Sequence, residues 1–146
     1  MNKTLLTILL LTLAIALGAQ TGLFDISYGM SIQAAIDNLG EAGFTVANQT
    51  EDWLELVSID NYYVEKMELS FTEDGSVLVG WNIIYLPQED EDIEDLVMDA
   101  LVERHGDYAE WDDNMEYYFW NLDDIHWVYA GWDWDYETYW VEYTTE

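Results

Sequence analysis

The 146-residue sequence contains no cysteine and only three lysine and arginine residues, whereas aspartate and glutamate together number 31. Without cysteine there can be no disulfide bond and no cysteine nucleophile, so packing alone must hold the fold together. Such a high net charge would ordinarily suggest disorder, but aromatic residues make up 16% of the chain. That aromatic content argues for a folded protein with a core.

The scarcity of basic residues limits the possible partners, because the formal net charge is −28. Binding to phosphates requires clustered lysine and arginine, which excludes nucleic acid and disfavours an anionic membrane surface. A protein with a basic patch, metal cations or a neutral glycan are the partners left. Alternatively, the charge is an adaptation to a salty habitat and reflects no partner, since salt screens the repulsion between like charges.

Sequence motifs of catalysis are missing as well. The chain has no HExxH, no Gly-x-Ser-x-Gly and no phosphate-binding loop, and its two histidines fall on different predicted elements. His105 lies in the last turn of a predicted helix, where it suits the helix dipole, and His126 is expected to face solvent. We therefore predict a non-catalytic protein with no catalytic residues, no metal site and no cofactor.

Residues 1–19 have the order of a secretory signal peptide. Lys3 precedes an apolar run at 5–17 that is shorter than the roughly 20 residues of a membrane span, and small residues follow it. An uncleaved anchor is the alternative interpretation. The sequence thus predicts a periplasmic or extracellular protein with no membrane anchor after cleavage, in which only Lys66 and Arg104 would oppose the acidic residues.

Residues 20–146 are predicted to form a single α+β domain. Apolar residues spaced i, i+3, i+4, i+7 indicate a helix capped by Ser31 and a second helix, with acidic first turns, that ends before Gly106. In the second helix, the predicted apolar face consists of Ile93, Leu96, Val97, Ala100 and Leu101. Alternating patterns and turn residues predict strands at 44–48, 53–59, 63–71, 77–86, 115–121, 125–131 and 138–144.

This order of elements predicts two α-then-antiparallel-β-meander halves, about 27–87 and 88–146. We expect them to form one continuous antiparallel sheet, or two small packed sheets, with both helices on one face. The other face of the sheet must then be solvated or bind something.

The first half resembles the small envelope proteins of the BamE/SmpA type over residues 27–85. The similarity consists of Gly29-Met30-Ser31 before a helix ending in Leu39-Gly40, and of the hairpin motif at 69–75. The chain departs from that pattern in lacking the lipid-bearing cysteine and in having a second half. The tandem architecture is similar to that of the β-lactamase inhibitor proteins, whose paired units present a concave, aromatic-rich, acidic sheet to an enzyme. Both resemblances imply a scaffold that binds protein and performs no chemistry.

The stretch GWDWDYETYW at 131–140 is the candidate binding site. It fails as a calcium loop, because Thr138 and Thr144 stand where glycine and glutamate are required. We expect a hairpin tip and flank whose indoles cannot all leave water without burying the neighbouring carboxylates. Tryptophan and tyrosine also concentrate binding energy at interfaces. The predicted binding residues are Trp132, Asp133, Trp134, Asp135, Tyr136, Glu137 and Trp140.

Together these observations predict a secreted or periplasmic acidic, aromatic-rich protein that engages another protein carrying a basic patch. A glycan-binding module, in which the rings stack on sugars, is the second hypothesis. The third is an enzyme of unknown type, which would show a buried, paired carboxylate in a cleft.

Overall fold

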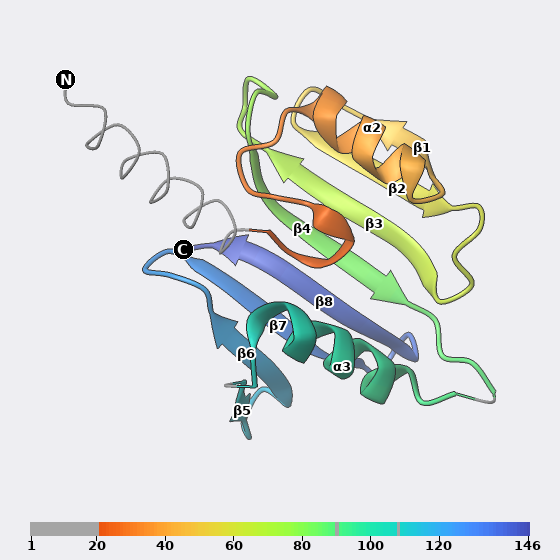
Figure 1. Ribbon diagram of the computed structural model, residues 1–146, viewed down its shortest axis with the longest axis vertical. Coiled ribbons are helices and arrows are strands. Elements are labelled where there is room, and N and C mark those ends of the chain that lie inside the picture. Colours follow the sequence, from red (N-terminus) through yellow and green to blue (C-terminus); the bar gives the residue numbers. More distant parts are fainter. Residues whose placement is uncertain (1–20, 90, 108) are drawn as a thin grey trace, which may run out of the picture.

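A computed structural model describes residues 21–89, 91–107 and 109–146 (Figure 1). The predicted signal peptide lies outside the described residues. The first half contains the 3-10 turn η1 (Leu23–Asp25), helix α2 (Ile32–Glu41) and strands β1 (Phe44–Gln49), β2 (Trp53–Ser58), β3 (Val64–Phe71) and β4 (Leu78–Tyr85). The second half contains helix α3 (Ile93–His105) and strands β5 (Glu110–Asp112), β6 (Tyr117–Asn121), β7 (His126–Asp133) and β8 (Thr138–Thr145).

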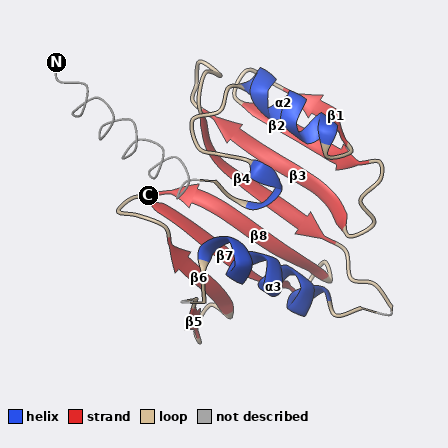
Figure 2. Ribbon diagram, in the orientation of Figure 1, coloured by secondary structure: helices blue, strands red, loops and turns tan. Residues whose placement is uncertain are grey.

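The strands form one antiparallel sheet in the order β1-β2-β3-β4-β8-β7-β6-β5. Each half is a four-stranded meander, and the two meanders meet along their last strands, β4 and β8 (Figure 2). The predicted α+β class with an antiparallel sheet is therefore confirmed. Of the two arrangements expected from the sequence, the continuous sheet is the one observed.

Both helices begin and end as their local sequence requires. The Ser31 hydroxyl accepts a hydrogen bond from the Ala34 N–H at 3.2 Å, and the Asp92 carboxylate caps α3 by accepting from Glu94 and Asp95 N–H. Gly43 and Gly106, just past the two helices, adopt φ of 89° and 90°, which glycine reaches without steric cost.

Burial alternates along the strands and leaves one face of the sheet in the core. Direct cross-strand partners such as Leu69 and Trp81, or Ile83 and Val141, are almost completely buried. Buried residues of both helices, including Leu39 and Val97, belong to the same hydrophobic cluster. Both helices lie in front of the sheet in the view of Figure 1.

The segment before α2 crosses the seam between the halves, as the orange chain in front of β4 in Figure 1 shows. The Leu23 N–H donates to the Tyr143 hydroxyl at 3.0 Å, and the Tyr28 hydroxyl donates to the Thr144 carbonyl at 2.9 Å. Tyr143 itself stacks on Trp81 with ring centroids 4.3 Å apart. This N-terminal segment therefore fastens β4 and β8 together from the core side.

Three expectations about individual residues were wrong. Leu96 was placed on the apolar face of its helix, but its side chain is 40% exposed, whereas Ile93, Val97 and Leu101 are buried. His126 is only 8% exposed rather than solvent-facing, because its ring packs 4.0 Å from the Tyr28 ring.

His105 does not act as a cation at the end of α3. Two causes lower the pKa of His105 to about 4: burial is the larger, and the positive charge of Arg104 is the smaller. Its Nε2 lies 2.9 Å from the Tyr143 hydroxyl oxygen. Since that oxygen already accepts from Leu23, its proton can be donated to a neutral His105 ring. His105 thus stabilises the seam between the halves instead of the helix dipole.

Candidate binding surface

The sheet face opposite the buried side chains is called here the open face. Its residues alternate with the core residues along each strand, and the cross-strand register places them in continuous rows. The Lys66–Ile84–Trp140 row and the Glu68–Asn82–Glu142 row both cross the seam. The open face includes Trp53, Glu55, Val57, Lys66, Glu68, Ser70, Asn82, Ile84, Tyr117, Phe119, Trp127, Tyr129, Trp140, Glu142 and Thr144.

Five half-buried rings cover the second-half part of the open face. Trp127 and Tyr129 are nearly parallel, at 15° and 6.4 Å between centroids, and Phe119 lies 6.2 Å from Trp127. Tyr117 meets Tyr129 edge to face at 5.2 Å and Trp140 at 6.3 Å. We call Tyr117, Phe119, Trp127, Tyr129 and Trp140 the ring cluster. The rings shield one another sideways, as paired aromatic side chains on a sheet do, and keep part of their surface in solvent.

Gly131 makes room for this packing on the open face. A Cβ atom at this position would lie 3.1 Å from the Cβ of Tyr117 and 3.3 Å from Cζ2 of Trp140. Close approach of the two rings to the strand therefore depends on the absence of a side chain at Gly131.

Ion pairs cover the first-half part of the open face. The Lys66 ammonium lies 2.8 Å from a Glu68 oxygen and 3.5 Å from a Glu55 oxygen. Its pKa is raised, chiefly by the hydrogen bond to Glu68. Asn48 donates a further hydrogen bond to Glu55 at 2.8 Å. The charges of this region are thus largely paired within the chain.

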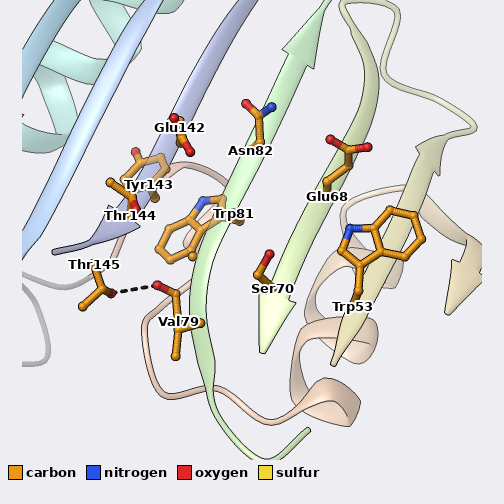
Figure 3. A pocket seen from close by; sticks show the side chains of 11 residues that line it. Trp53, Glu68, Ser70, Val79, Trp81, Asn82, Glu142, Tyr143, Thr144 and Thr145 are labelled. Atoms are coloured by element: carbon orange, nitrogen blue, oxygen red, sulfur yellow. Dashed lines mark hydrogen bonds between the residues drawn. The ribbon is translucent and has the colours of Figure 1, made fainter. Parts of the chain in front are cut away.

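A hollow of about 390 Å³ lies where the two regions meet (Figure 3). Glu68, Asn82 and Glu142 stand side by side across β3, β4 and β8 at one end of it, and Trp53 lies toward β2. Gly80 lets β4 approach β8, since a Cβ there would lie 2.9 Å from the Tyr143 carbonyl oxygen.

Two buried polar atoms of the open face find no hydrogen-bond partner among the described residues. They are Oδ1 of Asn82 and Nε1 of Trp127. A buried polar atom without a partner costs about 1–3 kcal/mol. Both atoms are covered by neighbouring protein atoms, so a ligand reaches them only if the side chains around them move.

The predicted hairpin tip is confirmed, but the sheet divides the predicted binding residues. β7 and β8 pair up to Asp133 and Thr138, so residues 134–137 form the tip. The Asp133 carboxylate accepts from the Asp135 and Tyr136 N–H groups and shapes this turn. Asp135 and Glu137 are exposed, with Glu137 in the left-handed region at φ 55°.

The three predicted indoles do not form one surface. Trp132 and Trp134 stack on the helix side of the sheet, with centroids 5.3 Å apart, and line a pocket beside α3. Trp140 points to the open face and belongs to the ring cluster. Tyr136 projects from the tip and is 78% exposed.

Sequence reasoning missed four members of the ring cluster as site residues. Alternation along 125–131 predicts one shared face for Trp127 and Tyr129, and alternation along 138–144 predicts one for Trp140 and Glu142. What the sequence lacked was the register of β7 on β8, which pairs Tyr129 with Glu142 and so joins the two sets.

Among the described residues, the hydrogen-bonded pair Asp123 and His126 comes nearest to an acid–base arrangement of an enzyme. His126 Nδ1 lies 2.7 Å from Asp123 Oδ2. Burial raises the pKa of Asp123, but hydrogen bonds from the His126 ring and from two backbone N–H groups outweigh it and leave the pKa below its usual value. Within the described ranges every aspartate and glutamate is at least partly exposed.

No group of three or more histidine, aspartate and glutamate side chains could hold a metal ion in the part of the chain that is described. Likewise, none of the described helices has the length and apolar character needed to cross a membrane.

Comparison with family models, with curated proteins and with solved structures finds no match to this chain. The site must therefore be interpreted from its own geometry.

Proposed function

We propose that this protein is a non-catalytic binding protein that engages another protein through the open face of its sheet. The observation that carries the proposal is the ring cluster on a sheet face that no described element covers. Large aromatic side chains, half-buried and contiguous, are the residues that most often dominate binding energy. In this arrangement the two helices cover one face and leave the other for the partner.

Polar groups of the open face support the same proposal. Asn82 Oδ1 and Trp127 Nε1 lack partners in the described chain, and a partner that displaces the side chains covering them would satisfy both. Glu142 stands between Asn82 and Tyr129 in the cross-strand row, with no cation paired to it among the described residues. An aromatic surface bearing an unpaired carboxylate favours a partner that carries lysine or arginine.

The architecture supports a partner of protein size. Eight strands form one broad surface, and the hollow at the seam could receive a protruding loop. The resemblance to the β-lactamase inhibitor proteins, whose tandem units present such a sheet to an enzyme, agrees with this proposal.

A glycan is the second candidate ligand. The nearly parallel planes of Trp127 and Tyr129 favour it, since sugar rings stack on aromatic faces. Under this alternative the open face would bind neutral oligosaccharides, and salt would have little effect on affinity.

Affinity capture with matched variants tests the proposal. Tyr129→Ala and Trp140→Ala should each weaken binding of the captured protein by about 2 kcal/mol, or roughly thirtyfold in Kd. Tyr136→Ala, at the exposed tip, is the matched control and should bind like the wild type. Raising NaCl should slow association with a basic partner. Thermal melts must show that each variant is folded at the temperature of the assay.

Two outcomes would overturn the proposal. Equal capture by the ring-cluster variants and the control would remove the open face as the interface. Binding of the wild type to a glycan array alone, lost in Trp127→Ala, would replace the protein partner with a sugar.

We also propose that the protein acts in the periplasm or outside the cell. The support is the pattern of residues 1–19, with Lys3 before a short apolar run. The intact mass of the exported protein tests this, with an N-terminus at Ala19 or Gln20 expected. A soluble product that retains Met1 would contradict it.

A further inference from the structure

A second pocket lies on the helix side of the sheet, away from the open face. It has a volume of about 260 Å³ and sits between the start of α3 and the outer strands β5–β8. Five of its lining residues are aromatic, and we call them the aromatic cup: Trp111, Tyr118, Trp132, Trp134 and Tyr139.

Strand register and the hairpin tip hold these rings together. Trp111 is the cross-strand partner of Tyr118, with ring centroids 4.7 Å apart, and Trp132 is the partner of Tyr139 at 5.3 Å. Trp134 stacks on Trp132 from the tip, at 5.3 Å and 20°. The sheet thus positions four of the rings before any ligand arrives, and the stack on Trp132 positions Trp134.

Two rings of the cup are unusually open for their size. Trp134 is 68% exposed and Trp111 is 46% exposed, although the chain has a full hydrophobic core in which such rings could be buried. Exposed rings that line one pocket together make that pocket a candidate binding site.

Carboxylates stand at the cup without any basic side chain beside them. Glu94 and Glu116 line it, and Oε2 of Glu94 accepts a hydrogen bond from Trp132 Nε1 at 2.6 Å. The two basic residues in the described ranges lie elsewhere. Lys66 pairs with Glu68 on the open face, and Arg104 pairs with Asp25 at 2.8 Å. The cup therefore combines electron-rich ring faces with negative charge that the described chain does not neutralise.

One buried polar group of the cup also lacks a partner. Tyr139 is fully buried in the sheet and lines the cup, and its hydroxyl forms no hydrogen bond with any described residue. Burial, followed by the nearby negative charge of Glu94, raises the pKa of this hydroxyl, so it stays neutral at physiological pH.

We propose that the aromatic cup binds a small organic cation through a quaternary ammonium group. Ring faces attract a cation within about 6 Å of their centroids, and the attraction is larger when the cation is desolvated. A quaternary ammonium group is covered by methyl groups and forms no N–H hydrogen bonds, so leaving water costs it less than it costs a primary ammonium. Anionic ligands are disfavoured by Glu94 and Glu116, and neutral ligands gain nothing from these charges.

The test compares a cation with a neutral molecule of the same shape. Choline and tetramethylammonium are titrated into the full folded protein by calorimetry and by tryptophan fluorescence, with ionic strength held constant by NaCl. The neutral isostere of choline, 3,3-dimethylbutan-1-ol, is titrated in parallel. We expect saturable binding of both cations at one site and at least tenfold weaker binding of the alcohol.

Matched variants locate the site. Trp134→Ala and Glu94→Gln should each weaken choline binding by roughly tenfold, because they remove a ring face and a charge from the cup. Tyr136→Ala changes an exposed ring on the same tip, and Asp95→Asn removes a neighbouring charge of α3. Neither Tyr136 nor Asp95 lines the cup, so both controls should bind choline within twofold of the wild type.

Several results would overturn the proposal. One is the absence of saturable binding of either cation, and another is equal affinity for the alcohol. A third is a loss of choline affinity in Asp95→Asn as large as in Glu94→Gln, which would indicate a non-specific effect of charge. Stacking of a neutral sugar in the cup, lost in Trp134→Ala, would also overturn it in favour of a glycan site. Because Trp134 and Glu94 lie on the face opposite the ring cluster, failure here leaves the protein-binding test unaffected.

Discussion

The two halves of the sheet have the same order of elements, yet they cover the open face with opposite chemistry. On β2 and β3, Lys66 bridges Glu55 and Glu68, so the open-face charges of these two strands are largely paired within the chain. On β6, β7 and β8, five rings stand together and Trp127 Nε1 lacks a partner. The same backbone arrangement thus carries paired charges in one half and a half-exposed ring cluster in the other. Binding free energy should come mainly from the ring cluster.

The seam between the halves should be the most sensitive place in the molecule. Tyr143→Ala removes the ring that stacks on Trp81 and accepts a hydrogen bond from Leu23. We expect a loss of about 3–5 kcal/mol in the free energy of unfolding, as for other buried aromatic residues. Urea denaturation measures it.

Tyr143→Phe provides the control for that experiment. It keeps the stacked ring but leaves the Leu23 N–H without its acceptor, so we expect a loss of about 1–2 kcal/mol. Equal losses in the two variants would show that hydrogen bonding, and not ring packing, holds the halves together.

Acid should weaken the same seam through His105. Its pKa is about 4 in the folded protein and 6.5 in the unfolded chain, so the unfolded state binds more protons between these values. The stabilisation is complete above pH 6.5 and is lost as pH falls toward 4. Because solvent reaches part of the ring, we expect a loss of about 1–2 kcal/mol.

The measurement is the pH dependence of unfolding in the wild type and in His105→Gln. Subtracting the variant's profile removes the contribution of the many carboxylates, whose protonation also relieves repulsion as pH falls. A variant with an unchanged slope between pH 6.5 and 4 would contradict the assignment to His105. An NMR titration of the ring should give a midpoint near 4.

Lys66→Met should lower the free energy of unfolding by removing the cation between Glu55 and Glu68. Glu55 and Glu68 are direct cross-strand partners, so removing the cation leaves two like charges facing each other. We expect a loss of about 0.5–1 kcal/mol that shrinks as NaCl is added, measured by urea denaturation.

The double variant Lys66→Met/Glu68→Gln should recover most of that loss, since it removes the repulsion as well. No recovery would indicate that packing of the lysine side chain, rather than charge, stabilises this half.

The hairpin tip should matter least for stability. Trp134 and Tyr136 are largely exposed, so changing either to alanine should alter the free energy of unfolding by no more than about 0.5 kcal/mol. Thermal melts check this, with the half-buried Trp140→Ala as the comparison expected to cost more. A tip variant that unfolds would mean that the stack on Trp132 belongs to the core.

Local sequence was sufficient to predict most of the elements. Capping by Ser31, alternation in β2 and β8, and turn residues at Asp123 and Asp133 act within a few positions of the chain, so the helices, hairpins and order of the halves follow from them. Strand β5 and turn η1 were missed because three residues are too few to show a period.

Only the tertiary structure decided which surface each aromatic residue joins. Alternation shows that Trp132 and Trp140 belong to strands, but the face that each one joins depends on the register of β7 on β8 and on the pairing of β8 with β4. The pairing of β4 with β8 has no local signal, because the two strands lie far apart in the sequence and share only a row of buried side chains. Trp132 and Trp134 therefore came to line the aromatic cup while Trp140 joined the ring cluster, since a sheet places neighbouring side chains on opposite faces.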